Sequence, residues 1–484
     1  MQLQSIFDLV DVQIFAFMLF YIRNMSKLNL TYQLSKFVSI FRKDDVFCYY
    51  HSLKMAQIYL TQEQNEDIKR YLESNIETIG NRQIIECFRK NEFLVSTKED
   101  EDFLFEKVKK NVLSPQLTVG YIVLTEACNL ACNYCFLGNG KKSIEHNLNS
   151  MDVKVAEKSL NVFIQQSLLS CKDDGIKRNI IFYGGEPLIN FKMLKFIIEL
   201  YKQYRLDGQC PFDISFSIVT NGTLITDEIA DYFKENEINV SLSLDGPTLK
   251  SNENRILQTT KKCAYNNIIK GLSILQNANC IFGLSYTLSE QSLEVSPKNL
   301  LHFLIENKIY TISFNTLICN DGLKSKTYYE KAASYIIDFW KLARKNHIFE
   351  DRMSRKIKAF ATREFLYNDC AATSGCQLCF YPDSSIRICH GCKKGDTKTN
   401  WNIFEAENIR YMESDEVFDW MKYSPIFHEE CKYCSAISIC GGGCVLNKKA
   451  NRDNQNIDLG FCIQTKKILE FLIWDLYKKL RESK

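Results

Sequence analysis

The sequence predicts an α/β protein whose centre is a partial (β/α)6 TIM-like barrel. Three observations support this fold class. Apolar strand-like runs alternate with amphipathic helical segments between residues 113 and 350, a shorter region of strand-like alternation precedes them, and a loop-rich region with many cysteines follows them. We therefore expect a small α+β domain, a barrel and a cysteine-rich domain, in that order.

The opening residues 1–24 have an apolar run, IFAFMLFYI, that is too short to span a bilayer. They also lack the basic start and the small-residue cleavage site of a signal peptide. Met25 opens a more natural beginning, so we expect residues 1–24 to be an N-terminal extension that adds nothing to function.

Residues 25–112 are expected to form the small α+β domain. Residues 37–60 alternate apolar and polar side chains as paired strands do, with a turn at KDD. Two helical patterns follow, and Thr61 with Gln64 three residues later is typical of a capping box at the start of the first.

Residues 113–350 contain the repeating strand–helix units. The expected strands lie in LTVGYIVLTEA, NIIFYGGEP, ISFSIVTNG, INVSLSLDGP, CIFGLSYTLS and YTISFNTLIC. Consecutive β–α units imply a parallel sheet, and six rather than eight predict a barrel that is open on one side. An open side admits a large substrate.

Residues 351–484 lose this alternation and end in an amphipathic helix over 465–482. Loops of this length in a compact domain need another source of order, and bound metal is the obvious one.

The overall composition limits the partners of the protein. Sixty-one Lys and Arg residues nearly balance 58 Asp and Glu residues, which argues against binding to nucleic acid or to an anionic membrane. Twenty cysteines without a secretion signal indicate reduced, metal-binding thiols in a cytoplasmic protein.

Three of these cysteines, Cys128, Cys132 and Cys135, follow the first expected barrel strand in the stretch CNLACNYCF. Active sites of α/β barrels lie at this end of the strands. Three thiolates at this spacing can hold a cubane iron–sulfur cluster and leave one iron open. A structural zinc ion would want a fourth Cys or His close by.

The stretch CNLACNYCF resembles the CxxxCxΦC signature of radical S-adenosylmethionine (SAM) enzymes, with Tyr134 as the aromatic residue Φ. The resemblance implies a [4Fe-4S] cluster on Cys128, Cys132 and Cys135 whose open iron binds SAM. It also implies that cleavage of SAM gives a 5′-deoxyadenosyl radical, which abstracts hydrogen from an unactivated position. Phe136, the last residue of the stretch, is expected to contact the cofactor.

Polar turns after the next strands agree with this resemblance. By analogy the SAM contacts are Gly184, Gly185, Glu186 and Pro187 of GGEP, Asn221 of VTNG, Ser243 of SLDGP, and Arg255. Glu186 would accept the SAM ammonium, and Arg255 would match a carboxylate. Relatives often carry an acidic residue shortly before this arginine, whereas this chain has SNENR.

The C-terminal cysteines resemble the SPASM extension of radical SAM enzymes, which carries two auxiliary four-iron clusters. The resemblance implies one set of Cys370, Cys376, Cys389 and Cys444, and a second of Cys431, Cys434, Cys440 and Cys462. Spacing alone fits a pair of zinc ribbons equally well. Ser384 stands where the family usually has glycine, which is tolerable if the turn does not need positive φ.

Three residues near the first set are left open. Cys379 and Cys392 are either buried filler or thiols that exchange or engage substrate. His390, directly after Cys389, is either a proton acceptor or a hydrogen-bond donor to a cluster sulfur.

The N-terminal domain resembles the winged-helix-like, leader-recognising segment of radical SAM peptide maturases, which would bind an extended leader at a sheet edge. The alternative is a domain that merely caps the barrel. We therefore expect an oxidoreductase-type maturase that modifies a ribosomally made precursor peptide, forming a thioether bond as sactipeptide and ranthipeptide maturases do. It would draw electrons from a flavodoxin- or ferredoxin-type donor.

Two alternatives to this function stay open. An anaerobic sulfatase maturase would oxidise Cys or Ser to formylglycine, against which His390 in place of an aspartate argues modestly. A non-catalytic binding protein stabilised by zinc is the alternative of another class.

Overall fold

The computed structural model divides the chain into two compact units, Met1–Val108 and Lys109–Lys484. It describes residues 31–96, 101–112, 114–138, 149–171, 175–318, 324–396, 398–399, 401–450 and 457–483. The proposed extension, residues 1–24, lies outside the described residues. Each unit is considered by itself.

The first unit holds two small antiparallel sheets. Strands β2 (Val38–Lys43), β3 (Val46–His51) and β4 (Ala56–Thr61) form one, and β1 (Tyr32–Leu34) pairs with β5 (Leu94–Ser96) in the other. The β2–β3 turn lies at KDD as expected, with Asp44 at a φ of 53°.

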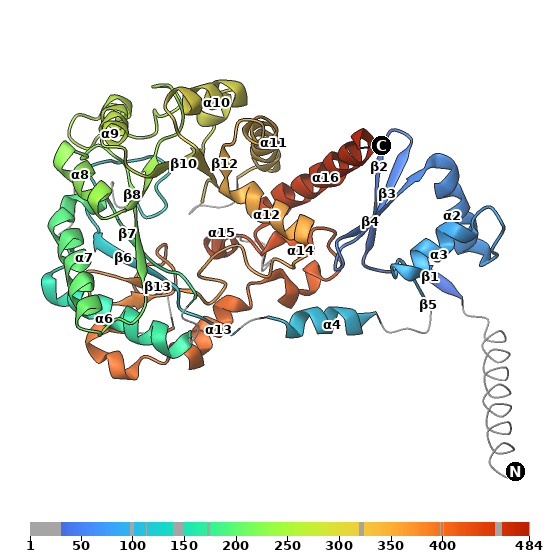
Figure 1. Ribbon diagram of the computed structural model, residues 1–484, viewed down its shortest axis with the longest axis horizontal. Coiled ribbons are helices and arrows are strands. Elements are labelled where there is room, and N and C mark those ends of the chain that lie inside the picture. Colours follow the sequence, from blue (N-terminus) through green and yellow to red (C-terminus); the bar gives the residue numbers. More distant parts are fainter. Residues whose placement is uncertain are drawn as a thin grey trace, which may run out of the picture. The chain divides into compact units, whose positions relative to one another are not determined.

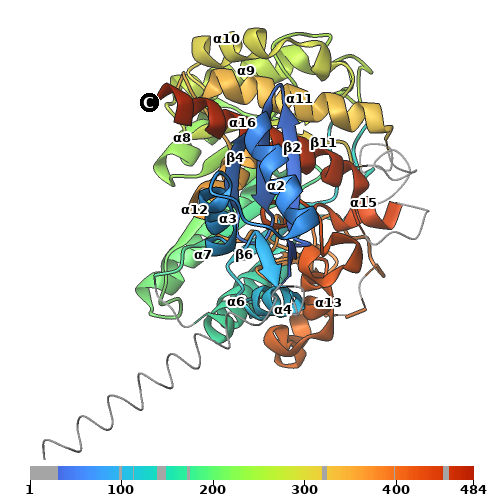
Figure 2. The same ribbon diagram turned by 90° about the vertical axis from the view of Figure 1, so that its right-hand side faces the viewer.

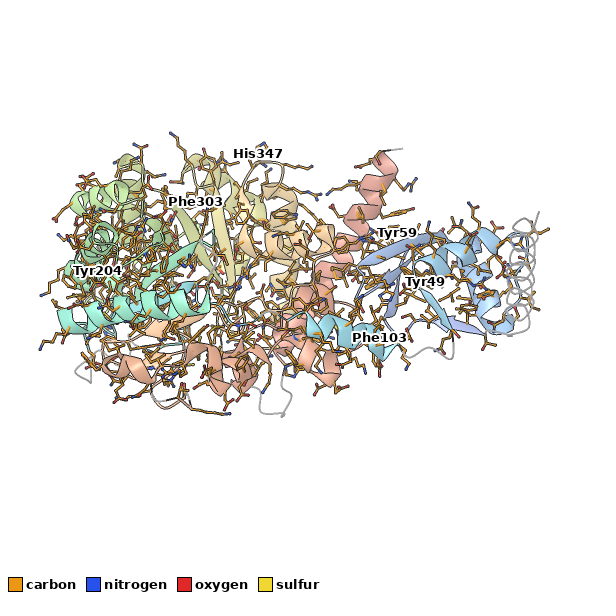
Figure 3. All side chains as sticks on the ribbon, turned by 60° about the horizontal axis from the view of Figure 1, so that its bottom comes forward. Tyr49, Tyr59, Phe103, Tyr204, Phe303 and His347 are labelled. Atoms are coloured by element: carbon orange, nitrogen blue, oxygen red, sulfur yellow. The ribbon has the colours of Figure 1, made fainter. Side chains whose placement is uncertain are left out.

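Helices α2 (Gln62–Ser74) and α3 (Arg82–Lys90) supply the rest of this unit's core. The predicted capping box is present: Gln64 N donates to Thr61 Oγ1 at 3.3 Å, and Thr61 N donates to Gln64 Oε1 at 3.0 Å. Tyr49 of β3, labelled in Figure 3, packs edge-on against Phe88 with ring centroids 5.0 Å apart. Helix α4 (Asp102–Lys110) runs across the boundary to the second unit.

The second unit is built on a parallel sheet, which confirms the central prediction. The order along it is β12-β11-β10-β9-β8-β7-β6-β13-β14. The expected strands are β6 (Val119–Thr125), β7 (Arg178–Gly184), β8 (Ile214–Thr220), β9 (Asn239–Ser243), β10 (Phe282–Leu288) and β11 (Thr311–Thr316), followed by the short β12 (Phe349–Glu350). Each pairs in parallel with its neighbour in the chain.

Helices follow the strands and form an outer layer around them (Figure 1). They are α6 (Val153–Ser170), α7 (Phe191–Leu206), α8 (Asp227–Glu235), α9 (Tyr265–Asn277), α10 (Pro297–Glu306) and α11 (Lys326–Ala343). Successive helices α10 and α11 lie side by side (Figure 2). Their apolar faces and the sheet share one core, which contains Phe163, Phe182 and Phe216.

The cysteine-rich segment is not a separate compact unit but continues the barrel sheet. Strand β13 (Gln377–Phe380) pairs in parallel with β6 and antiparallel with β14 (Ile386–Arg387). The remaining helices are α12 (Asp351–Thr362), α13 (Asp415–Met421), α14 (Ile437–Cys440), α15 (Val445–Ala450) and α16 (Leu459–Glu482). Short 3-10 turns lie at Pro187–Asn190, Ser292–Glu294, Ile403–Asn408, Tyr411–Glu413, Pro425–Phe427 and Glu429–Cys431.

Two local details differ from expectation. The last helix begins at Leu459, earlier than predicted, because Asp458 caps it by accepting from Phe461 N at 3.1 Å. Ser384 has a φ of 66°, so the β13–β14 turn does use the left-handed conformation that glycine favours. Within the described ranges we find no helix with the length and apolar character of a membrane span.

Candidate active site

The three cysteines of CNLACNYCF lie on the loop that follows β6, at the carboxyl edge of the parallel sheet. All three are partly buried. Backbone bonds fix the loop to the segment after β9, since Ala131 N donates to Ile256 O at 2.7 Å and Asn133 N donates to Asn254 O at 3.1 Å. The loop is therefore held on both sides of Cys132, the middle cysteine of the triplet.

The environment of Cys128 and Cys132 disfavours ionisation of their thiols in the absence of a positive partner. Burial, together with the charges of Glu186, Cys132 and Cys135, raises the pKa of Cys128 to about 12. Burial also raises the pKa of Cys132 to about 11, against the lowering effect of Arg255. Thiolates at these positions need a positive partner, which a bound metal would provide.

Asp245, at the end of the β9 segment, connects the cysteine loop to Arg255. Its buried carboxylate accepts from Arg255 Nε and Nη2, each at 2.9 Å, and from the hydroxyl of Tyr134. Thr287 N of β10 donates to the same carboxylate at 2.9 Å. The guanidinium group of Arg255 thus makes a bidentate contact with Asp245. Through Asp245 and Tyr134, Arg255 holds the cysteine loop from inside the protein.

The turn GGEP, after β7, packs directly on the cysteine loop. Gly185 N donates to Thr125 O at 2.9 Å, and Glu186 N donates to Ala127 O at 2.8 Å. A Cβ on Gly184 would lie 2.3 Å from Thr125 O, and one on Gly185 would lie 2.1 Å from Ala127 O. Both glycines are needed for this close approach, and Pro187 then opens a 3-10 turn.

Glu186 is fully buried and its carboxylate is already hydrogen-bonded. It accepts from Thr220 Oγ1 at 2.7 Å, Asn221 N at 2.8 Å and Leu188 N at 3.1 Å. Burial raises its pKa to about 7, although these donors oppose the shift. Glu186 therefore ties the end of β7 to the end of β8 beside the triplet.

The other expected SAM contacts lie along the same edge. Asn221 Nδ2 is 4.0 Å from Cys128 Sγ and donates to Asn129 Oδ1 at 2.9 Å. Ser243 is the last residue of β9 and is half-buried. Phe136 is partly buried, with its ring edge-on to His390 at 6.0 Å between centroids. The structure thus brings the expected contacts from β6, β7, β8 and β9 to one side of the sheet.

The second set of auxiliary cysteines is brought together. Burial and, to a smaller extent, the charges of Cys440 and Cys434 raise the pKa of Cys431 to about 12. Cys462 has its pKa raised in the same way, by burial and then by Cys440, Cys431 and Cys434. The buried Lys356 donates to the carbonyls of Ile439 and Cys440 at 3.2 and 3.3 Å, which places a positive charge beside this group.

The first set is brought together only in part. Cys389 and Cys444 both lie close enough to Cys370 for its charge to affect their pKa values. The backbone N of Cys376 donates to Ala371 O, beside Cys370, at 3.0 Å. Its thiol is 3.5 Å from Ser374 O, and the cysteine whose charge raises its pKa is Cys171, after α6.

His390 lies between the two kinds of cysteine site, inside an aromatic wall. Its ring stacks on Tyr121 of β6 at 4.5 Å and meets Tyr183 of β7 edge-on at 4.7 Å. Its buried Nδ1 has no hydrogen-bond partner within the described residues. Burial lowers its pKa to about 4, so the ring is neutral at pH 7.

Several of these residues were not predicted. Tyr121 and Tyr183 lie at strand positions whose pattern predicts ordinary core residues. The contact between Asp245 and Tyr134 joins residues far apart in the sequence. The signal for Asp245 was present, because a buried acid in SLDGP needs a cationic partner such as Arg255. In the part of the chain that is described, no three or more His, Cys, Asp or Glu side chains converge on a single metal-ion position.

A parallel α/β barrel with a cysteine triplet at its carboxyl edge defines a class of iron–sulfur enzymes. Residues 122–294 match the model of the radical SAM superfamily. These residues form a radical SAM domain, and enzymes of that superfamily use SAM and a [4Fe-4S] cluster.

Two curated relatives extend the likeness beyond the barrel. The radical SAM cyclopropyl synthase TigE of Paramaledivibacter caminithermalis is 23% identical over 480 residues, covering 91% of this chain and 95% of TigE. A cysteine-type anaerobic sulfatase-maturating enzyme of Clostridium novyi is 23% identical and covers 71% of this chain and 91% of its own length.

Among solved structures, native anSMEcpe with bound AdoMet and Cp18Cys peptide aligns with a TM-score of 0.62 at 20% identity. The alignment covers 76% of this chain and 100% of that one. At this identity the likeness shows a shared fold.

Replacement of Asp245 tests its role as a positioning residue. Asp245→Asn leaves the buried Arg255 without its counter-charge, which costs about 3–5 kcal/mol for a buried pair. We expect the loop that carries Cys132 and Cys135 to loosen, so that iron bound per chain and SAM cleavage both fall. Metal analysis and deoxyadenosine assays of anaerobically purified protein measure this.

The matched control is Asp213→Asn, because the Asp213 side chain pairs with Arg205 at 2.8 Å but is 90% exposed. That variant should behave as wild type. Equal iron and equal SAM cleavage in D245N and D213N would contradict the positioning role.

Proposed function

We propose that this protein is a radical SAM maturase that modifies a ribosomally synthesised precursor peptide, forming a thioether between a cysteine sulfur and a carbon. The observation that carries the proposal is the position of Tyr183 and His390. Tyr183 lies close to Cys135 and Cys128 of the triplet, and also to Cys389 of the auxiliary group, since the charges of all three affect its pKa. A peptide side chain that packs against Tyr183 and His390 would lie near both the cysteine triplet and the auxiliary cysteines.

The residues at the two sites fit iron–sulfur clusters. Cys128, Cys132 and Cys135 would hold the SAM cluster, with Glu186, Asn221, Ser243 and Arg255 around the cofactor. Two further [4Fe-4S] clusters would lie on the C-terminal cysteines. When bound, SAM and a reduced cluster supply a 5′-deoxyadenosyl radical that removes one hydrogen atom from the peptide.

Thioether formation removes a second hydrogen from the peptide, from the cysteine thiol, as a proton and an electron. The neutral, unpartnered Nδ1 of His390 is the proposed proton acceptor. The C-terminal cysteines would hold an iron–sulfur cluster that would supply an acceptor for the electron, and a flavodoxin- or ferredoxin-type protein would be the external donor for SAM cleavage. The enzyme would act in the cytoplasm.

The first unit is proposed to bind the leader of the precursor. Among the described strands, β2 lies at an edge of its sheet with β3 as its neighbour, and Ile40 on it is 50% exposed. An extended peptide can add to such an edge through backbone hydrogen bonds.

Two other products are favoured by specific comparisons. The match to TigE covers nearly the whole chain, which favours carbon–carbon ring closure as the second candidate. The match to a sulfatase-maturating enzyme favours formylglycine as the third.

Anaerobic co-expression with a small cysteine-containing precursor peptide encoded nearby separates these outcomes. Thioether formation gives a peptide lighter by two hydrogens whose thiol no longer reacts with iodoacetamide. Ring closure gives the same mass change with a reactive thiol, and formylglycine replaces the sulfur by oxygen. Cys128→Ala should abolish deoxyadenosine production and every product, while iron on the auxiliary sites remains.

An unmodified peptide with active SAM cleavage would contradict the choice of substrate. Continued SAM cleavage by C128A would contradict the assignment of the triplet.

The role of His390 is tested by His390→Asn, which keeps a polar group of similar size but removes the basic nitrogen. We expect peptide modification to fall about 10²-fold, the usual contribution of a general base, while deoxyadenosine production and iron content persist. The control is His302→Asn, since His302 is exposed and its Nε2 pairs with Glu306 on α10. Loss of auxiliary-cluster iron, or a shifted cluster potential with product formation intact, would instead identify a hydrogen bond to the cluster.

A further inference from the structure

A closed ring of three hydrogen bonds joins the cysteine loop to the turn after β8. Asn221 Nδ2 donates to Asn129 Oδ1 at 2.9 Å, and Asn129 Nδ2 donates to Thr223 Oγ1 at 2.7 Å. The Thr223 hydroxyl completes the ring by donating to Asn221 Oδ1 at 2.7 Å. Each side chain therefore donates one bond of the ring and accepts another. Asn129 directly follows Cys128, so the ring contacts the loop beside the first cysteine of the triplet.

The backbone of the turn fixes the direction of this ring. A backbone N–H can only donate, and Thr223 N donates to Asn221 Oδ1 at 3.0 Å. The oxygen of the Asn221 amide must therefore face Thr223, which leaves its nitrogen facing Asn129. The turn is itself anchored, because Asn221 N donates to Glu186 Oε2 at 2.8 Å. The buried Asn221 side chain thus has one orientation that satisfies these neighbours.

This orientation directs the second N–H of the Asn221 amide at Cys128. An amide nitrogen carries two hydrogens, and the bond to Asn129 uses one of them. Asn221 Nδ2 also makes a long N–H···S contact with Cys128 Sγ, at 4.0 Å. Leu130 N donates to the same sulfur at 3.4 Å. Cys128 Sγ therefore faces one N–H group from its own loop and another that the ring holds in place.

The ring is separate from the Asp245 contact, which reaches the cysteine loop at Tyr134. We propose that Asn129 and Thr223 are positioning residues of the radical SAM centre. They hold the Asn221 amide so that its N–H donates to the sulfur of the first cysteine of the triplet. The proposal rests on the SAM cluster that the proposed function assigns to the triplet, and it does not depend on the peptide substrate.

The position of the Asn221 amide has a defined effect on a cluster bound to the triplet. Hydrogen bonds to the sulfurs of an iron–sulfur cluster help to set its reduction potential. An N–H group stabilises the reduced cluster more than the oxidised one, because the reduced cluster carries more negative charge. The Asn221 N–H should therefore raise the potential of the SAM cluster and favour the reduction that precedes SAM cleavage. An amide that rotates freely would lose this effect.

Removal of the Thr223 hydroxyl tests the proposal without a peptide. Thr223→Val keeps the shape of the side chain but breaks both of its bonds in the ring, whereas Thr223→Ser keeps the hydroxyl. A redox titration of the electron paramagnetic resonance signal that responds to SAM gives the potential of the SAM cluster. We expect a more negative potential in T223V and in Asn129→Ala, and the wild-type potential in T223S.

The matched control is Thr362→Val, which removes a hydroxyl from an exposed threonine. Thr362 Oγ1 donates to Lys358 O at 2.9 Å within α12. This variant should keep the wild-type potential.

An unchanged or more positive potential in T223V would overturn the proposal, and so would a T223S variant that shifts as T223V does. Loss of the triplet's iron from T223V with its retention in T223S would support the proposal, since serine keeps both bonds of the hydroxyl. If T223V does not fold, N129A decides, because the proposal requires the same negative shift there.

The same titration separates this proposal from the proposed function. A protein that shows these shifts but never modifies a peptide would refute the proposed function and leave the positioning roles standing. A wild-type protein without a signal that responds to SAM would contradict the cluster on the triplet, and the positioning roles with it.

Discussion

The burial of thiols away from water is the constraint on which the rest of this structure depends. A buried thiol without a positive partner stays protonated, and burial raises the pKa of Cys128, Cys132, Cys431 and Cys440 for this reason. The fold gathers many such thiols near one edge of the sheet. Bound metal would supply the charge that makes those positions favourable, and it would couple folding to cluster binding.

Polar side chains then hold the cysteine loop in place from inside the protein. Asp245 joins Tyr134, Arg255 and β10, while Glu186 joins the ends of β7 and β8. Each is a buried acid whose oxygens are satisfied by donors from different elements. A rigid loop of this kind can present three thiolates and leave one coordination position for a cofactor.

Much of the fold was predictable because it depends on local pattern. The six parallel strands followed from the alternation of apolar runs and helices, and the start of α2 followed from Thr61 and Gln64. The cysteine spacing marked the candidate sites for the same reason. Cysteine spacing does not show which distant strands pair, so the position of the cysteines around β13 depended on its pairing with β6.

The sequence pattern also did not predict that the cysteine-rich segment continues the barrel sheet. Pairing of β13 with β6 joins residues more than 250 positions apart (Leu378 with Gly120, Phe380 with Ile122). This pairing brings His390 against Tyr121 and Tyr183, and so creates the wall between the two kinds of cysteine site.

The central claim is that the triplet holds a cluster with one iron open to SAM. Electron paramagnetic resonance of the anaerobically reduced protein, recorded with and without SAM, tests it most directly. The account predicts a reduced [4Fe-4S] signal that changes on addition of SAM and is absent from C128A. A spectrum that SAM leaves unchanged, or a protein that contains zinc and no iron, would contradict it.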